Sequence, residues 1–246
     1  MNTYVELIDK HKGEDCFVLA AGPSLFDVFY KEYKDYIGLF QDKVVISVNA
    51  SIIACMEHLD WLGDGSVSDG RYWISDDSLT TRWSWWKFVE QAKCTKIVRD
   101  SWLKQKHYGN IDDFLHFSAR PTPEDVVNKE DVGLAYCSSA PSAIDLGIQM
   151  GCKNIYLLGL DHDKKDGKVY FWEYFAKANH PKQFKPGKPP WHVQKDMYRV
   201  NAMAYEALDN FAEEKGCNIY NCSEIAHQKK TTYQFKFKDF ADIINK

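Results

Sequence analysis

The chain has 246 residues, a net charge of −4 and 45% hydrophobic residues. This composition is that of a globular protein, and it excludes a disordered chain, a collagen-like chain and a disulfide-stabilised miniprotein. The length suits one large domain, and the mildly acidic charge excludes a protein that coats nucleic acid generally.

Short apolar runs alternate with longer amphipathic stretches along the chain, which is typical of an α/β protein. A short helix is expected over residues 2–12. A further strand is expected to end at Trp61–Leu62, and a helix is expected over Leu79–Ala92. The other strands predicted before residue 120 are Cys16–Ala20, Val44–Val48, Lys96–Val98 and Phe114–Phe117.

The segment from Ser138 to Asp161 has the clearest pattern. Pro141 lies near the start of a predicted helix, where its missing N–H costs nothing, and Gly151 suits the position after the helix end. The apolar run Asn154–Leu158 follows as a strand. This strand–helix–strand spacing predicts a βαβ unit and therefore a parallel sheet.

A helix over Asp196–Lys215 and a strand over Asn218–Tyr220 complete the predicted elements. We therefore expect an α/β fold: a single Rossmann-like nucleotide-binding domain over residues 1–246, with a mostly parallel sheet and helices on both faces. The segment 177–190 holds four of the eight prolines and four lysines, and few apolar residues. Such a composition buries little surface, so this segment is expected to be a mobile lid.

Seven cysteines are scattered through apolar runs without a C-x-x-C pair, which is typical of reduced, buried thiols in a cytoplasmic protein. No apolar run approaches the roughly 18 residues of a membrane span, and the charged N-terminus is unlike a signal peptide. A cytoplasmic location and no membrane span are expected.

Three predicted strands end in residues suited to ligand binding, and ligands of such sheets lie beyond the carboxyl ends of the strands. The first strand ends in Ala21, Gly22, Pro23 and Ser24. Glycine allows close approach of a ligand, and the start of the next helix offers N–H groups to a phosphate. We expect Gly22→Val to weaken nucleotide binding with little loss of fold. An ordinary strand-to-helix turn is the alternative interpretation.

Asn49 follows the second strand, where its carboxamide can contact a nucleotide or sugar hydroxyl, or cap the following helix. Asp161, His162 and Asp163 follow the strand at 154–158. Carboxylates there can bind ribose hydroxyls, hold a metal or act as a base. Because neighbouring side chains on an extended chain point opposite ways, at most two of the three can converge.

These strand ends, in this order, resemble glycosyltransferase family 42, the bacterial sialyltransferases, and the domain-of-unknown-function 115 family. That second family includes archaeal MptE-like 6-hydroxymethylpterin diphosphokinases and flagellin glycosyltransferases. Residues 21–25 are similar to the Gly-x-Gly-Pro-Ser-Leu turn of the sialyltransferases, and residues 151–161 to a Gly-x-Lys-x-Ile-Tyr-Leu-x-Gly-x-Asp strand. The resemblance covers roughly residues 15–225.

The resemblance implies a role for each matching residue. His192, which precedes the last long helix, matches the general base, and Asp161 ends the signature strand and is taken as the second catalytic residue. The donor-binding residues so implied are Ala21, Gly22, Pro23, Ser24, Asn49, Ser138, Ser139 and Tyr170, with Asp64 added as a candidate. No protein-bound metal is expected.

The sequence departs from the sialyltransferase pattern at three places. Ala20-Ala21 replaces a Gly-Asn pair, Asp163 stands where a second phosphate-binding Tyr is expected, and Tyr136 stands where an Arg precedes the serine loop. These departures bear on the CMP-sialic-acid donor more than on the fold. His162 is the next candidate for the base, and Trp85 is the tryptophan of the Arg-Trp-Ser-Trp-Trp run expected outside the core.

The leading hypothesis is a metal-independent glycosyltransferase that uses a nucleotide sugar as co-substrate, with no tightly bound cofactor. Its acceptor is a glycan, a protein or a modified nucleobase in DNA, and a homo-oligomer is possible. The alternatives are an MptE-like diphosphokinase that uses ATP and Mg²⁺, held by Asp161 with Asp64 or Asp163, and a nucleotide-binding module without catalysis. Loss of turnover with EDTA favours the diphosphokinase.

Overall fold

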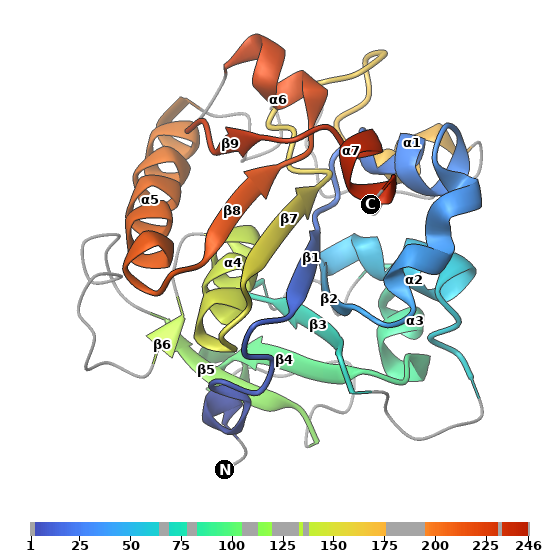
Figure 1. The fold of residues 1–246 in the computed structure, drawn as a ribbon. Coiled ribbons are helices and arrows are strands. Elements are labelled where there is room, and N and C mark those ends of the chain that lie inside the picture. The colour runs from blue at the N-terminus through green and yellow to red at the C-terminus, as the bar shows by residue number, and fades with distance from the viewer. Residues whose placement is uncertain are drawn as a thin grey trace.

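The computed structural model describes residues 3–63, 69–77, 83–104, 113–119, 133–134, 138–175, 195–230 and 233–245. Its strands form one sheet in the order β6-β5-β4-β3-β2-β1-β7-β8-β9, and every named strand pair is parallel (Figure 1). This confirms the predicted α/β class. The predicted lid at 177–190, together with Asp64, Tyr136 and His192, lies outside the described residues.

The elements are bounded as follows. The strands are β1 (Asp15–Leu19), β2 (Val44–Val48), β3 (Arg71–Ser75), β4 (Thr95–Arg99), β5 (Leu115–Ala119), β6 (Gly133–Leu134), β7 (Asn154–Leu158), β8 (Asn218–Asn221) and β9 (Lys236–Phe237). The α-helices are α1 (Leu25–Tyr30), α2 (Ile52–His58), α3 (Trp86–Gln91), α4 (Ser139–Gln149), α5 (Lys195–Glu214), α6 (Glu224–Lys229) and α7 (Ala241–Ile244). The 3₁₀ helices are η1 (Tyr4–Leu7), η2 (Lys34–Phe40), η3 (Asn49–Ser51), η5 (Asp100–Lys104) and η7 (Phe171–Tyr174).

Side-chain alternation along the central strands builds a core on each face of the sheet. In β1, Cys16 and Val18 pack with α4 and α5, whereas Phe17 and Leu19 pack with α1, α2 and α3. Figure 1 shows α4 and α5 on one side of the sheet and α1, α2, α3 and α7 on the other. Helices cover both faces of the sheet, which explains why β2 and β7 are nearly continuous apolar runs in the sequence.

The direction in which strands are added reverses between β1 and β7. The chain moves outward from β1 through β2 to β6, then returns along α4 to place β7 on the free side of β1. In open parallel sheets, the crevice beyond the carboxyl ends of the strands at such a reversal is where ligands bind. A ligand site is therefore expected at the carboxyl ends of β1, β2 and β7.

The prediction of the third strand was wrong. Trp61 is buried after α2, and the strand that pairs with β2 is Arg71–Ser75 instead. Trp61 packs into the core from a turn, whereas Leu62 is 52% exposed, so the pair does not form a strand. The expected leading helix is the short η1, and the described part of the helix expected at 79–92 is α3, Trp86–Gln91.

Candidate functional site

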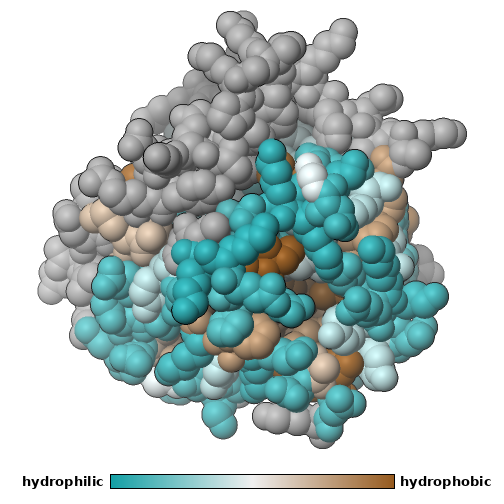
Figure 2. Space-filling view, turned by 90° about the horizontal axis from the view of Figure 1, so that it is seen from above, coloured by the Kyte–Doolittle hydropathy of each residue, from teal (hydrophilic) through white to brown (hydrophobic). Residues whose placement is uncertain are grey.

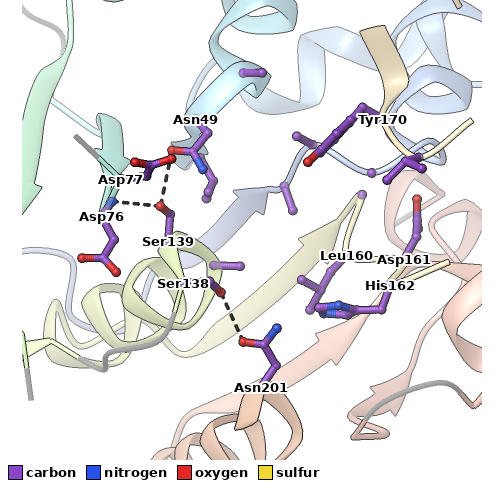
Figure 3. Close-up of a pocket in the computed structure, with 18 of the residues that line it drawn as sticks. Asn49, Asp76, Asp77, Ser138, Ser139, Leu160, Asp161, His162, Tyr170 and Asn201 are labelled. Carbon is purple, nitrogen blue, oxygen red and sulfur yellow. Dashed lines mark hydrogen bonds between the residues drawn. The ribbon is translucent and has the colours of Figure 1, made fainter. Parts of the chain in front are cut away.

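A cavity of about 460 Å³ lies at the carboxyl ends of β1, β2, β3 and β7. It is lined by Ala21 and Gly22 after β1, Asn49 after β2, and Ser138 and Ser139 at the start of α4. Figure 3 shows these polar residues along one side of the cavity and Tyr170, Asp161 and His162 along the other. Most of the residues predicted to bind the donor are therefore brought together, although Pro23 and Ser24 do not line this cavity.

The outer surface at this end of the molecule is largely polar. Figure 2 looks down on the carboxyl ends of the central strands and shows hydrophilic residues over most of the described surface, with a few hydrophobic residues near the middle. No helix within the described residues is long and apolar enough to cross a membrane.

The backbone after β1 and the backbone after β7 approach each other closely at Gly22 and Gly159. The Gly22 N–H donates to the Gly159 carbonyl over 2.9 Å, and Gly159 has a φ of +72°. A Cβ on Gly22 would lie 2.4 Å from the Gly159 oxygen and 2.5 Å from Asp161 Oδ2. The expectation that Gly22→Val leaves the fold nearly intact is therefore wrong, because the side chain would meet backbone and a fixed carboxylate.

We expect Gly22→Ala to lower the free energy of unfolding by about 1–3 kcal/mol, the usual cost of overpacking a filled site. The measurement is urea unfolding followed by circular dichroism. Gly38→Ala is the matched control, because a Cβ at Gly38 has no heavy atom within 4 Å. Equal stability of the two variants would contradict this account of the turn.

Asp161 holds the turn after β1 in place through hydrogen bonds. Its Oδ2 accepts from the Ser24 N–H over 2.7 Å, and its Oδ1 accepts from the Ser24 hydroxyl over 2.5 Å and from the Ser223 hydroxyl. The residue is 1% exposed, and burial raises the pKa of its carboxyl, although the hydrogen bonds from Ser223 and Ser24 oppose the shift. Both oxygens are thus engaged in holding three segments together, and its predicted catalytic role remains a prediction.

Hydrogen bonds around the start of α4 fix the polar side of the cavity. The Ser139 hydroxyl donates to Asn49 Oδ1 over 3.3 Å and accepts from the Asp76 N–H over 2.8 Å. The Ser138 hydroxyl donates to Asn201 Oδ1 over 3.4 Å. The first N–H groups of a helix have no partner within it, so this arrangement holds anion-binding donors at the cavity wall.

Asn49 has a φ of +51°, a left-handed conformation that asparagine tolerates better than most residues. Its backbone carbonyl accepts from the Trp73 indole N–H over 3.0 Å. This unusual backbone turns the carboxamide toward Ser139 and into the lining of the cavity (Figure 3). Asn49 therefore lines the cavity, and its contact with the donor stays a prediction.

Sequence reasoning missed the residues that follow β3. Asp76 and Asp77 line the cavity, and Arg99 Nη1 lies 3.5 Å from Asp76 Oδ1. Burial raises the pKa of the Asp76 carboxyl, and Arg99 opposes that shift. Recognising Arg71–Ser75 as a strand would have exposed this signal, because Asp76 and Asp77 follow it directly.

His162 and Asp163 both line the cavity but contact different partners. His162 lines the cavity with a φ of +51°, and its Nε2 lies 3.0 Å from the Tyr205 hydroxyl. Asp163 Oδ2 instead pairs with Lys229 Nζ at 3.1 Å. Within the described residues, no group of three or more His, Cys, Asp or Glu side chains is arranged to hold a metal ion.

Another part of the cavity wall is lined by four aromatic residues: Trp83, Trp85, Tyr170 and Trp172. Tyr170 and Trp172 stack with ring centres 4.6 Å apart, and Trp83 lies 6.1 Å from Trp172. The Phe171 N–H donates to the Ala21 carbonyl over 3.1 Å, which holds this segment beside the β1 turn. Burial raises the pKa of the Tyr170 phenol.

The tryptophans of the 82–86 run divide between the cavity and the core. Trp85 lines the cavity, as does Trp83, whereas Trp86 packs against Trp73 at 5.8 Å between ring centres. Trp85 is only 5% exposed and contributes to the core as well. The expectation that Trp85 lies outside the core was therefore wrong, although it does reach the cavity.

Solved structures similar to this chain include the MAf glycosyltransferase of Magnetospirillum magneticum AMB-1, at 11% identity and a TM-score of 0.54. That match covers 98% of this chain and 38% of the other, so the chain spans well under half of that protein. The α-2,3-sialyltransferase Cst-I of Campylobacter jejuni matches at 17% identity and a TM-score of 0.43, over 87% of this chain and 78% of the other. No protein-family model and no curated protein matches the sequence. The chain thus shares its fold with part of the MAf glycosyltransferase.

Proposed function

We propose that the protein is a glycosyltransferase that takes a sugar from a nucleotide-activated donor and passes it to a hydroxyl group. One observation carries the proposal: the cavity lies where the strand order reverses and collects Gly22, Asn49, Ser138 and Ser139 around the start of α4. Backbone N–H groups at a helix start favour a phosphate, and Asn49 offers hydrogen bonds to the rest of a nucleotide.

The reaction needs a base and stabilisation of the leaving group. His192 removes the proton of the acceptor hydroxyl, whose oxygen attacks the anomeric carbon of the donor sugar. The bond from that carbon to the phosphate oxygen breaks, and the nucleotide leaves with both electrons. The Tyr170 phenol, which lines the cavity and is protonated at neutral pH, donates to the leaving phosphate.

The direct test is nucleotide release from a panel of nucleotide sugars, with and without EDTA. Faster release of one nucleotide in the presence of protein, unchanged by EDTA, supports a metal-independent transferase. Stabilisation by one nucleotide without release of any sugar from the panel contradicts the enzyme and leaves a binding module.

A diphosphokinase is the second candidate, and the carboxylates of Asp76 and Asp77 in the cavity lining favour it. Carboxylate oxygens are ligands that Mg²⁺ accepts. The Mg²⁺ ligands expected from the sequence fit less well. Both carboxylate oxygens of Asp161 already accept hydrogen bonds from Ser24, and Asp163 pairs with Lys229. Transfer of diphosphate from ATP to a pterin, abolished by EDTA, would replace the glycosyltransferase proposal with this one.

We expect Asn49→Asp to weaken nucleotide binding by about tenfold or more. Aspartate has nearly the same side-chain shape as asparagine and also tolerates a positive φ, but it places a negative charge beside the proposed phosphate site. Titration calorimetry with the nucleotide that stabilises the wild type measures the effect. Asn210→Asp adds the same charge at an exposed position of α5 and should leave the affinity unchanged. Equal affinities of the two variants would remove Asn49 from the site.

A further inference from the structure

We propose that the aromatic part of the cavity, defined by Trp83, Trp85, Tyr170 and Trp172, is a subsite for an uncharged pyranose ring. The inference rests on the proposed function and names the chemical class of sugar that the site takes. It is carried by the shape of this wall, by its unpaired indole donors and by the charges that line the cavity.

Four aromatic rings line this part of the cavity. Trp83 and Tyr170 are half-buried, whereas Trp85 and Trp172 are each 5% exposed. Tyr170 and Trp172 stack within 12° of parallel, and the rings of Trp83 and Trp85 lie 5.7 Å apart. All four residues line the cavity that Asn49 and Ser139 also line. A pyranose has an apolar C–H face that packs on such rings and hydroxyl groups at its edge that need polar partners.

Two indole N–H groups on this wall lack a hydrogen-bond acceptor among the described residues. They are Nε1 of Trp83 and Nε1 of Trp85, both buried. The neighbouring Trp86, which does not line the cavity, donates its N–H to Glu90 Oε1 over 2.9 Å. Buried indole N–H groups usually find a partner, and they can only donate. Both Nε1 atoms are buried from solvent, so an oxygen-bearing ligand supplies their acceptors only where the indoles turn toward the cavity as it binds.

The charge of the described lining disfavours an acidic sugar. Asp76, Asp77, Asp161 and Asp163 bring four carboxylates, and among the described lining residues Arg99 is the one Lys or Arg. The Arg99 guanidinium is itself paired with Asp76 at 3.5 Å. Lys229, which does not line the cavity, is likewise paired with Asp163 at 3.1 Å. Both cations are thus engaged by carboxylates, so an acidic sugar would meet the remaining carboxylates with less compensation than an uncharged one.

The test is saturation-transfer NMR titration of the full chain, without nucleotide. The probes are methyl α-glucopyranoside, methyl β-galactopyranoside and the methyl glycoside of sialic acid. We expect at least one neutral glycoside to bind about tenfold more tightly than the sialoside. Trp85→Phe should weaken the neutral glycoside by about three- to tenfold, the effect of one lost hydrogen bond.

Trp86→Phe is the matched control, because Trp86 is as buried as Trp85 but its N–H is paired within the protein. It should leave glycoside binding unchanged. Trp83→Phe, at a half-buried position, gives the same test should Trp85→Phe fail to fold. Binding of the sialoside as tight as that of both neutral glycosides, or equal binding by the cavity variant and the control, overturns the proposal.

Two added nucleotide sugars, UDP-glucose and GDP-mannose, separate the two sources of a pyranose. Displacement of the glycoside by the nucleotide sugar but not by the free nucleotide assigns the subsite to the donor sugar, and simultaneous binding assigns it to the acceptor. Failure of every nucleotide to bind contradicts the proposed function alone, since glycoside binding is measured without nucleotide. Failure of every neutral glycoside to bind contradicts this inference alone.

Discussion

Replacing His192 with alanine is expected to lower turnover by about 10²–10⁴-fold, the usual cost of losing a general base. Nucleotide affinity should stay close to that of the wild type, because the proposed donor contacts lie on the Gly22 turn, Asn49 and the start of α4, which line the cavity. The measurement pairs single-turnover sugar transfer with titration of the nucleotide, so that binding and chemistry are read separately.

His227→Ala is the control for the general-base prediction. His227 stacks on Phe237 with ring centres 4.3 Å apart and does not line the cavity. It should leave turnover unchanged. Wild-type turnover in the His192 variant would contradict the assignment and make His162, which does line the cavity, the next candidate.

Asp161→Ala is expected to lower the free energy of unfolding by about 3 kcal/mol or more. The substitution leaves the Ser24 N–H and the hydroxyls of Ser24 and Ser223 without their acceptor, at a residue that is 1% exposed. Each buried polar group left unsatisfied costs about 1–3 kcal/mol. Urea unfolding measures the loss.

Asp163→Ala separates this effect from the general loss of a carboxylate. Asp163 pairs with Lys229, whose side chain is 49% exposed, and exposed pairs contribute at most about 1 kcal/mol. The control variant should therefore unfold close to the wild type. Equal stability of the Asp161 and Asp163 variants would contradict the structural role given to Asp161.

Buried strands of the sheet were predictable because burial on both faces removes polar residues from them. Val44–Val48 and Asn154–Leu158 were predicted to the residue for this reason. The strand β3 was missed, because Arg71 and Tyr72 interrupt its apolar pattern. Their polar groups are satisfied by remote partners: Arg71 donates to the Asp60 carbonyl over 2.9 Å, and the Tyr72 hydroxyl lies 2.7 Å from His11 Nε2.

The position of the cavity was predictable from the ends of the strands, but the contacts that its residues make within the protein were not. Asn49 and Ser139 were chosen for their places after a strand and at a helix start, and the fold brings them within 3.3 Å. Asp161 was chosen by the same rule. Its engagement by Ser24, 137 residues away, and by Ser223, 62 residues away, follows only from the folded chain.

Hydrogen exchange followed by mass spectrometry, with and without the nucleotide that most stabilises the protein, tests most directly whether the cavity binds the donor. The account predicts slower exchange in residues 20–26, 48–52 and 138–142, which surround the cavity. Residues 8–14 and 150–153, at the opposite ends of β1 and β7, should exchange at an unchanged rate. Slower exchange in those two segments, with none around the cavity, would contradict it.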